Sequence, residues 1–352
     1  MIRTLLIATL LTLEQLAVAS PQASGAHQSS VTSGQARNPD RQPSPPANDE
    51  PRVLQPGSPK PVAVPPFSVF RESKCDSSGN LYFAVGGDLS RLGSILEISH
   101  DAGGSTAFAP PTPEKLDPIR EVGFRDFAVT PSGRVYELLQ NPNDQSIAVV
   151  EFDSDGSVQH STKPATPEGL QVRSLAVFDD GTVLLRGFTR LRSRTDAARD
   201  YLALFDANGK LRKEITGLPD VDLAIRKTAL QDNGIAIGQD GNAYLLDADF
   251  ISVISESGEN VRHMPYRKPD SALVARGLRL SDGLIAIRVM HAKGVERTPR
   301  YLVVRADSGE TIGYYTLPDE TPEVGVCFSR SEGFTFLTQQ DMKLALVNAR
   351  LR

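Results

Sequence analysis

Residues 237–262 read IGQDGNAYLLDADFISVISESGENVR, and this stretch decides the fold. It holds two short runs of alternating apolar residues, Ala243–Leu246 and Ile251–Ile254. A glycine turn stands on each side, at Asp240-Gly241 and at Ser257-Gly258. Period-two alternation is typical of half-buried strands, and an Asp-Gly pair supplies the positive φ that a tight hairpin turn requires. The stretch therefore predicts a unit of antiparallel strands joined by short turns.

The same unit recurs along the chain. The first turn of each copy has its glycine at Gly79, Gly133, Gly181, Gly241, Gly283 and Gly333. The second turn has its glycine at Gly103, Gly156, Gly209, Gly258 and Gly309, at spacings of 53, 53, 49 and 51 residues. Three residues after each first-turn glycine stands a side chain expected to pack between sheets, at Tyr82, Tyr136, Leu184, Tyr244, Ala286 and Phe336. Six copies at about 48 residues each predict an all-β fold, a six-bladed β-propeller with four-stranded blades.

The sixth copy ends before a fourth strand can form. Its third strand is expected at Lys343–Val347, and the open sheet edge would be covered by Pro61–Val64. Cys75 and Cys327, the two cysteines of the chain, stand near the ends of the first and last inner strands. Those strands are neighbours only if the ring closes, so we expect a disulfide across a 252-residue loop. In the chain-entropy model this bond stabilises the fold by roughly 4–5 kcal/mol. Two buried free thiols are the alternative.

The N-terminal region is of a different composition. Residues 1–19 combine Arg3, an apolar run and Ala17-Val18-Ala19, as a cleavable signal peptide does, with a retained membrane anchor as the alternative. Residues 20–61 are rich in Pro and Ser and are expected to be a disordered tether ahead of a propeller at 62–352. We therefore expect a secreted or periplasmic protein, monomeric and with no transmembrane segment after cleavage. The net charge of −5 gives no reason to expect nucleic-acid binding.

The repeat resembles the NHL and TolB-like six-bladed β-propellers. The resemblance lies in units such as Gln239-Asp240-Gly241-Asn242-Ala243-Tyr244-Leu245-Leu246-Asp247 and covers about Val62 to Arg352. It implies that the first strand of each blade is innermost. It also implies that the short turns lie on one face, and that the second-to-third loops and the connections between blades lie on the other, the long-loop face. Binding groups concentrate on such loops above a rigid scaffold.

Basic residues gather at this long-loop face in the sequence. Arg71, Arg125 and Arg173 stand eight residues before their turn glycines, and Arg276 stands seven before Gly283. Two long loops add further candidates, which are Arg190, Arg192 and His291. Converging guanidinium groups bind carboxylate, sulfate or phosphate through paired hydrogen bonds. We therefore expect a binding or recognition module for an anionic small molecule, glycan or protein partner, with no cofactor and no metal site.

Two alternatives stay open. Glu72 and Asp126 directly follow Arg71 and Arg125, so the arginines could instead form a structural ring of ion pairs between blades. The chain contains no Gly-x-Ser-x-Gly elbow, HExxH motif or phosphate loop, so no catalytic residues are assigned and enzymatic activity is left undecided. The alternative function is a hydrolase or lyase that acts on an acidic saccharide or lactone. A lactonase of the gluconolactonase type would need a Glu, an Asn and an Asp on a cation, and Glu72 and Asn233 give an incomplete set.

Overall fold

The computed structural model divides by its contacts into Met1–Pro45 and a compact unit, Pro46–Arg352. The described residues all belong to the second unit. They are residues 50–64, 68–69, 73–86, 95–108, 123–141, 143–189, 199–216, 234–291, 299–317, 325–329, 331–340 and 343–351. Within these ranges, no helix is long and apolar enough to cross a membrane. The segments expected to be a signal peptide and most of the tether, residues 1–49, lie outside them.

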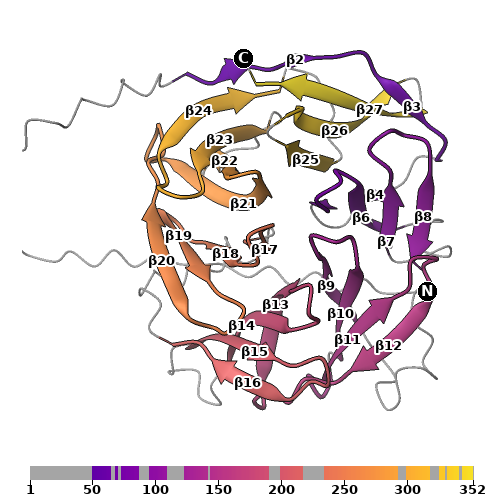
Figure 1. Ribbon diagram of the computed structural model, residues 1–352, viewed down its shortest axis with the longest axis vertical. Coiled ribbons are helices and arrows are strands. Elements are labelled where there is room, and N and C mark those ends of the chain that lie inside the picture. Colours follow the sequence, from indigo (N-terminus) through magenta and orange to yellow (C-terminus); the bar gives the residue numbers. More distant parts are fainter. Residues whose placement is uncertain are drawn as a thin grey trace, which may run out of the picture. The chain divides into compact units, whose positions relative to one another are not determined.

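The strands form six small sheets arranged as the blades of a β-propeller (Figure 1). Blade 1 contains β4 (Ser68–Val69), β5 (Lys74–Cys75), β6 (Leu81–Gly86), β7 (Ile95–Ile98) and β8 (Ser105–Phe108). Blade 2 contains β9 (Gly123–Val129), β10 (Val135–Gln140), β11 (Ile147–Phe152) and β12 (Val158–Thr162). Blade 3 contains β13 (Leu170–Val177), β14 (Val183–Thr189), β15 (Arg199–Phe205) and β16 (Leu211–Glu214).

Blades 4 to 6 complete the ring. Blade 4 contains β17 (Ile235–Ile237), β18 (Ala243–Leu246), β19 (Phe250–Ile254) and β20 (Asn260–Pro265). Blade 5 contains β21 (Leu273–Ser281), β22 (Leu284–His291), β23 (Arg300–Arg305) and β24 (Thr311–Thr316). Blade 6 contains β25 (Gly325–Ser329), β26 (Gly333–Gln340) and β27 (Lys343–Arg350). Each blade pairs its strands antiparallel in chain order, with the first strand innermost, which confirms the predicted fold class.

The recurring residues of the sequence have the structural roles that the repeat predicts. All six first-turn glycines have positive φ, between 74° and 90°. The six residues that follow them by three positions are buried, with at most 4% of each side chain exposed. The turns can therefore be tight, and the side chains three positions later fill the space between neighbouring sheets.

The core consists of six apolar clusters among the described residues, each placed between two adjacent blades. The cluster that joins the last blade to the first contains Leu81 and Phe83 of β6 with Leu337 of β26 and Leu344 of β27. Because every pair of neighbouring blades shares a cluster, the apolar faces of all six sheets are covered and the ring is closed.

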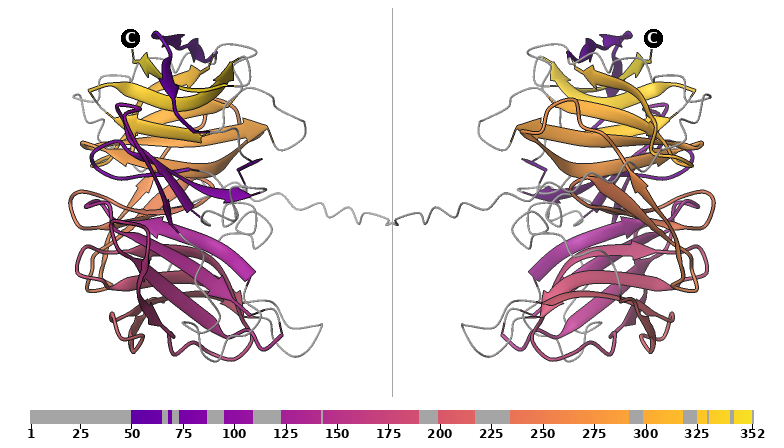
Figure 2. Two further views of the ribbon diagram at one scale, coloured as in Figure 1. Left: turned by 90° about the vertical axis from the view of Figure 1, so that its right-hand side faces the viewer. Right: turned by 90° about the vertical axis from the view of Figure 1, so that its left-hand side faces the viewer.

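The ring is closed by strand pairing as well as by packing. The segment β3 (Lys60–Val62) pairs antiparallel with β27, as the sequence predicts for the open edge of blade 6. Two further strands precede it in the range 20–61. The strand β2 (Gln55–Pro56) also pairs with β27, and β1 (Arg52–Val53) adds in parallel to β24 at the edge of blade 5. Figures 1 and 2 show these indigo strands beside the last strands of the chain.

The predicted disulfide is present. Cys75 of β5 and Cys327 of β25 are bonded, with their Cα atoms 5.8 Å apart. The bond links the inner strands of blades 1 and 6, whereas β2 and β3 join the two ends of the chain at the outer edge of blade 6. Among the described residues, no free cysteine is left.

Candidate functional site

Three of the predicted arginines occupy the same structural position. In β9, β13 and β21 a β-bulge interrupts the pairing of the innermost strand, and the extra residue is Arg125, Arg173 or Arg276. In sequence, Arg276 is one residue closer to its turn glycine than the other two. The two-residue turn Asp282-Gly283 between β21 and β22 accounts for this difference. A bulge bends the strand and changes the direction of a side chain, and it often lies next to a functional site.

The surroundings of the three arginines differ. Arg125 is half-buried, and its Nε is buried without a hydrogen-bond partner within the described ranges. The guanidinium group of Arg173 lies over the ring of Phe188, with Cζ 5.2 Å from the ring centroid. Arg276 donates from Nε to Sδ of Met290 at 3.1 Å. The three arginines therefore share one position in the innermost strand, but each has a different local environment.

The carboxylate next to Arg125 in the sequence is bound to a different cation. Asp126 of β9 forms a buried ion pair with Lys74 of β5, with Nζ 3.2 Å from Oδ1. The other oxygen of Asp126 accepts a hydrogen bond from the main-chain nitrogen of Leu175 at 2.8 Å. Lys74 also donates to the carbonyl oxygens of Phe127 and Leu175. An ion pair between blades thus exists at this place, and its cation is Lys74.

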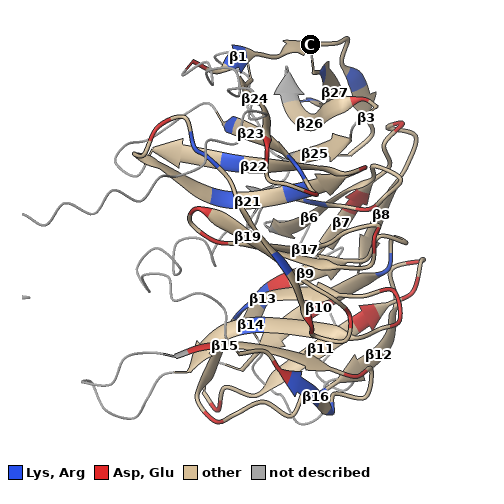
Figure 3. Cartoon of the chain, turned by 60° about the vertical axis from the view of Figure 1, so that its left-hand side comes forward, with Lys and Arg blue, Asp and Glu red and all other residues tan. Residues whose placement is uncertain are grey.

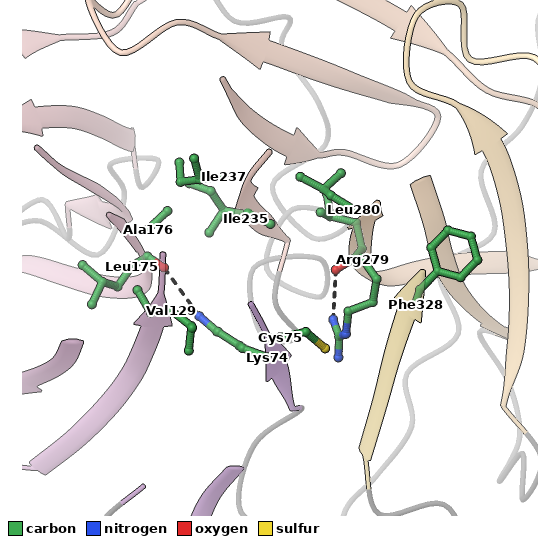
Figure 4. Close-up of a pocket in the computed structure, with 13 residues that line it drawn as sticks. Lys74, Cys75, Val129, Leu175, Ala176, Ile235, Ile237, Arg279, Leu280 and Phe328 are labelled. Atoms are coloured by element: carbon green, nitrogen blue, oxygen red, sulfur yellow. Dashed lines mark hydrogen bonds between the residues drawn. The ribbon is translucent and has the colours of Figure 1, made fainter. Parts of the chain in front are cut away.

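A small cavity of about 70 Å³ lies at the centre of the propeller and is lined by inner strands of all six blades. Apolar side chains make up most of its wall, among them Leu175, Ile235 and Leu278. Lys74 and Arg279 are its charged members (Figure 4). Arg279 donates to the carbonyl oxygens of Leu278 and Val326, each at 2.9 Å. The centre of the ring is therefore apolar with two cationic side chains.

Lys74 and Arg279 were not among the residues that the sequence singled out, although a signal for them exists. Each lies opposite the residue three positions after its turn glycine, as the pairs Lys74–Tyr82 and Arg279–Ala286 show. In the other blades this position is occupied by Ala128, Ala176, Ala236 and Val326. Two long cationic side chains at a position that is Ala or Val in the other four blades would have indicated which residues line the channel.

A larger cavity, of about 420 Å³, opens where the first-to-second turns meet. Cys75, Ile237 and Leu280 line both this cavity and the central one, so the two adjoin. The rim of the larger cavity is mainly acidic and is formed by residues of blades 1, 2, 4 and 5. It also carries the cation Arg262 of β20, whose Nη2 is 4.0 Å from Oδ2 of Asp240. Its carboxylates are those of Asp76, Asp240, Asp282 and Asp307.

Two tyrosines donate hydrogen bonds to carboxylates of this rim. Tyr82 donates to Asp76 at 3.0 Å, and Tyr244 donates to Asp240 at 2.7 Å. Burial, followed by the hydrogen bond to Asp240, raises the pKa of Tyr244 to about 12. Burial, followed by the negative charge of Asp76, raises the pKa of Tyr82 well above its usual value. Both hydroxyl groups therefore stay protonated at neutral pH and act as donors to the acidic rim.

Several predicted site residues lie outside the described residues. These are Arg71, Arg190 and Arg192. His291, at the end of β22, is described. Its Nε2 is 3.2 Å from Nη1 of Arg300, and its Nδ1 is 3.8 Å from Oδ2 of Asp270. His291 thus lies between the cation Arg300 and the carboxylate Asp270.

No grouping of three or more His, Cys, Asp or Glu side chains in the described part of the chain could hold a metal ion. The carboxylates of the acidic rim are therefore spread around the opening and do not form one coordination site.

No family model matches the chain, and no curated protein matches it. Solved structures do. A protein proposed to be a gluconolactonase is 15% identical, with a TM-score of 0.47, over 85% of this chain and 95% of the other. A gluconolactonase from Xanthomonas campestris is 14% identical, with a TM-score of 0.44, over 86% and 100%.

Hydrazine synthase from Kuenenia stuttgartiensis is 17% identical, with a TM-score of 0.40, over 62% of this chain. This chain spans 57% of the length of that structure. These likenesses concern the propeller fold and say nothing about activity.

Proposed function

We propose that the protein is an exported recognition module that binds an anionic group through arginines at the long-loop end of its inner strands. The observation that carries this proposal is Arg125. This arginine is the extra residue of a bulge in the innermost strand of blade 2, and its buried Nε has no hydrogen-bond partner within the described ranges. A buried donor without a partner costs about 1–3 kcal/mol, so its retention favours a role in binding.

The chemistry of the ligand follows from the side chain. A guanidinium group presents planar, paired N–H donors that match the oxygens of a carboxylate, sulfate or phosphate. Arg173 and Arg276 occupy the equivalent bulge positions in blades 3 and 5. Three arginines at the equivalent bulge position of three blades suit the binding of an anionic small molecule, a glycan or an acidic segment of a protein partner.

Export and the NHL or TolB-like type belong to the same proposal. A disulfide between Cys75 and Cys327 is compatible with an oxidising compartment, either outside the cell or in the periplasm. The turn Asp240-Gly241-Asn242, followed by the buried Tyr244, supports the resemblance to NHL and TolB-like repeats.

The test is binding of anionic probes to the purified protein by titration calorimetry. Sulfate, glucuronate and a galacturonate oligomer serve as probes, because they differ in size and carry the same kind of charge. Arg125→Gln removes the charge and keeps hydrogen-bonding capacity. We expect binding of the preferred probe to weaken about tenfold, as for the loss of one charge-assisted hydrogen bond.

Arg305→Gln is the matched control. It removes the same charge from the turn side of blade 5, where Arg305 pairs with Glu310 at 3.2 Å, and it should leave binding unchanged. Equal affinity of wild type and Arg125→Gln for every probe contradicts the proposal. Turnover of a lactone or of a uronic-acid polymer by the purified protein favours the alternative function, a hydrolase or lyase. Two residues that a metal-dependent lactonase site would use, Glu72 and Asn233, lie outside the described residues.

A further inference from the structure

The cavity on the turn side has a layered composition that the anion-binding function does not use. Its rim carries Asp282 and Asp307, on two turns of blade 5, together with Asp76 and with Asp240, which is paired with Arg262 of the same rim. Below the rim, Ile237 and Leu280 form an apolar collar that also lines the central cavity. Below the collar lie Lys74, which is paired with Asp126, and Arg279. A ligand that enters from the turn side thus meets negative charge, then apolar surface, then positive charge.

The acidic rim suits an organic cation better than a metal ion. A divalent metal takes several oxygen ligands within one compact shell. The described carboxylates form no such group, since no three of them lie close enough to hold an ion. An ammonium group donates separate hydrogen bonds to individual carboxylates and needs no compact shell. Figure 3 shows that acidic residues recur on the turns, whereas β21 and β22 carry basic residues.

The separation of the two charged layers sets the length of the ligand. Arg279 and Asp282 are three residues apart along β21 and its turn, and Lys74 and Asp76 are two apart. At about 3.3 Å per residue of extended strand, the layers are at most roughly 7–10 Å apart, because Asp76 and Asp282 lie on turns. An extended dipeptide spans roughly 7 Å. A free α-amino acid is too short to contact both layers.

The volume agrees with a ligand of this size. The turn-side cavity holds about 420 Å³, within the range of about 300–1,000 Å³ that small-molecule sites occupy. We propose that this cavity and the adjoining central cavity together bind a small zwitterion of about dipeptide length, a linear amino acid with its ammonium and carboxylate groups at opposite ends. The ammonium group lies at the aspartate rim, the carbon chain lies against Ile237 and Leu280, and the carboxylate faces Arg279.

The test uses ε-aminocaproate as the probe, with calorimetric titration of the full chain. Caproate and hexylamine each keep one of its charges on a similar chain, and glycine keeps both charges at a shorter distance. We expect ε-aminocaproate to bind at least tenfold more tightly than any of the three, because each loses charge-assisted hydrogen bonds at one layer. Equal binding of caproate or hexylamine, or no saturable binding of ε-aminocaproate, overturns the proposal.

Variants separate the two layers. Asp282→Asn with Asp307→Asn neutralises the rim, and Asn tolerates the positive φ of 43° at position 282. This double variant should bind ε-aminocaproate about tenfold more weakly and bind caproate as the wild type does. Asp155→Asn with Asp206→Asn is the control, because both residues lie on turns of other blades and do not line the cavity. If the control pair weakens binding equally, the effect is one of net charge and the rim is not the site.

The positively charged layer is tested by the variants Arg279→Gln and Arg279→Lys. The glutamine variant should lose about tenfold in affinity for ε-aminocaproate and nothing for hexylamine, and the lysine variant should keep most of the affinity. Unchanged affinity in the glutamine variant overturns the assignment of the carboxylate to this residue. Arg125→Gln, at the other end of the inner strands, should not affect this binding, so failure here is distinguishable from failure of the anion site.

Discussion

Glu97 is a carboxylate that the folded protein holds in an unfavourable place. It lies in β7, where partial burial raises its pKa above 4.5, and the negative charge of Asp76 raises it further. A carboxyl group with a raised folded-state pKa stabilises the fold fully below its unfolded pKa. That contribution is lost as the pH rises through the folded-state pKa. The ionised Glu97 is therefore a source of instability at neutral pH.

Glu97→Gln should raise the melting temperature at pH 7, by about 1 °C, and the gain should disappear by pH 4. Thermal unfolding followed by circular dichroism at both pH values measures this. Glu332→Gln is the control, because it removes the same charge from an exposed residue. A gain of the same size at pH 4 and at pH 7 would mean that glutamine acts through packing and not through charge.

The candidate site was only partly predictable from single residues. The spacing from the turn glycines brought Arg125 and Arg173 into one register, and the structure adds Arg276 to that register. The bulge at these positions was not predicted, because one extra residue only shifts the phase of the apolar alternation, and consecutive buried positions, as in β13, hide that shift. The partner of Asp126 was missed for a related reason. Lys74 comes from another blade, 52 residues away, and local sequence does not reveal such a contact.

In three of the second turns, those with Gly156, Gly209 and Gly309, a close approach to the preceding blade explains why glycine recurs. A Cβ atom added to Gly156 would lie 2.3 Å from the carbonyl oxygen of Ala107, in the outer strand of blade 1. The equivalent positions Gly209 and Gly309 approach the main chain of their preceding blades in the same way. Gly241, in a first turn, has nothing within 4 Å. Its recurrence rests on backbone conformation alone, while Gly156 also provides the close contact between blades.

Gly156→Ala and Gly241→Ala form a matched pair that separates these two reasons. Both glycines have positive φ, 84° and 74°, so each alanine costs about 1–2 kcal/mol of backbone energy. Only Gly156→Ala must also push β8 away, and it should lower the free energy of unfolding by at least about 1–3 kcal/mol more. Urea unfolding of the two variants gives both values. Equal costs would show that blade 1 moves aside freely.

The strands themselves could be predicted because the turn glycines and the alternating runs agree in every copy. The pairing of residues 52–56 could not be predicted, because prolines dominate that region and argue against strands. Proline is tolerated on an edge strand, where its missing N–H is not needed. Pro56 and Pro61 both lie in such outermost strands, β2 and β3.

Closure of the ring depends on two connections between the ends of the chain. The disulfide joins β5 to β25 at the inside, and β2 and β3 pair with β27 at the outside. The outer connection also buries Leu54 and Val62, which are 3% and 8% exposed. Either connection alone keeps blades 1 and 6 together, so the loss of one should be tolerated better than the loss of both.

Cys75→Ser with Cys327→Ser should lower the free energy of unfolding by about 2–5 kcal/mol. Deletion of residues 52–62 from the full chain exposes the edge of β27 and removes two buried apolar side chains, at a cost of about 3–6 kcal/mol. The two changes combined should lower the free energy of unfolding by more than the sum of the two separate losses. Neither connection then holds blades 1 and 6 together, so the two contributions are coupled. Urea unfolding followed by far-ultraviolet circular dichroism is suitable, since the chain contains no tryptophan. Strict additivity would show that the packing of Leu81 and Phe83 against blade 6 closes the ring without help from either connection.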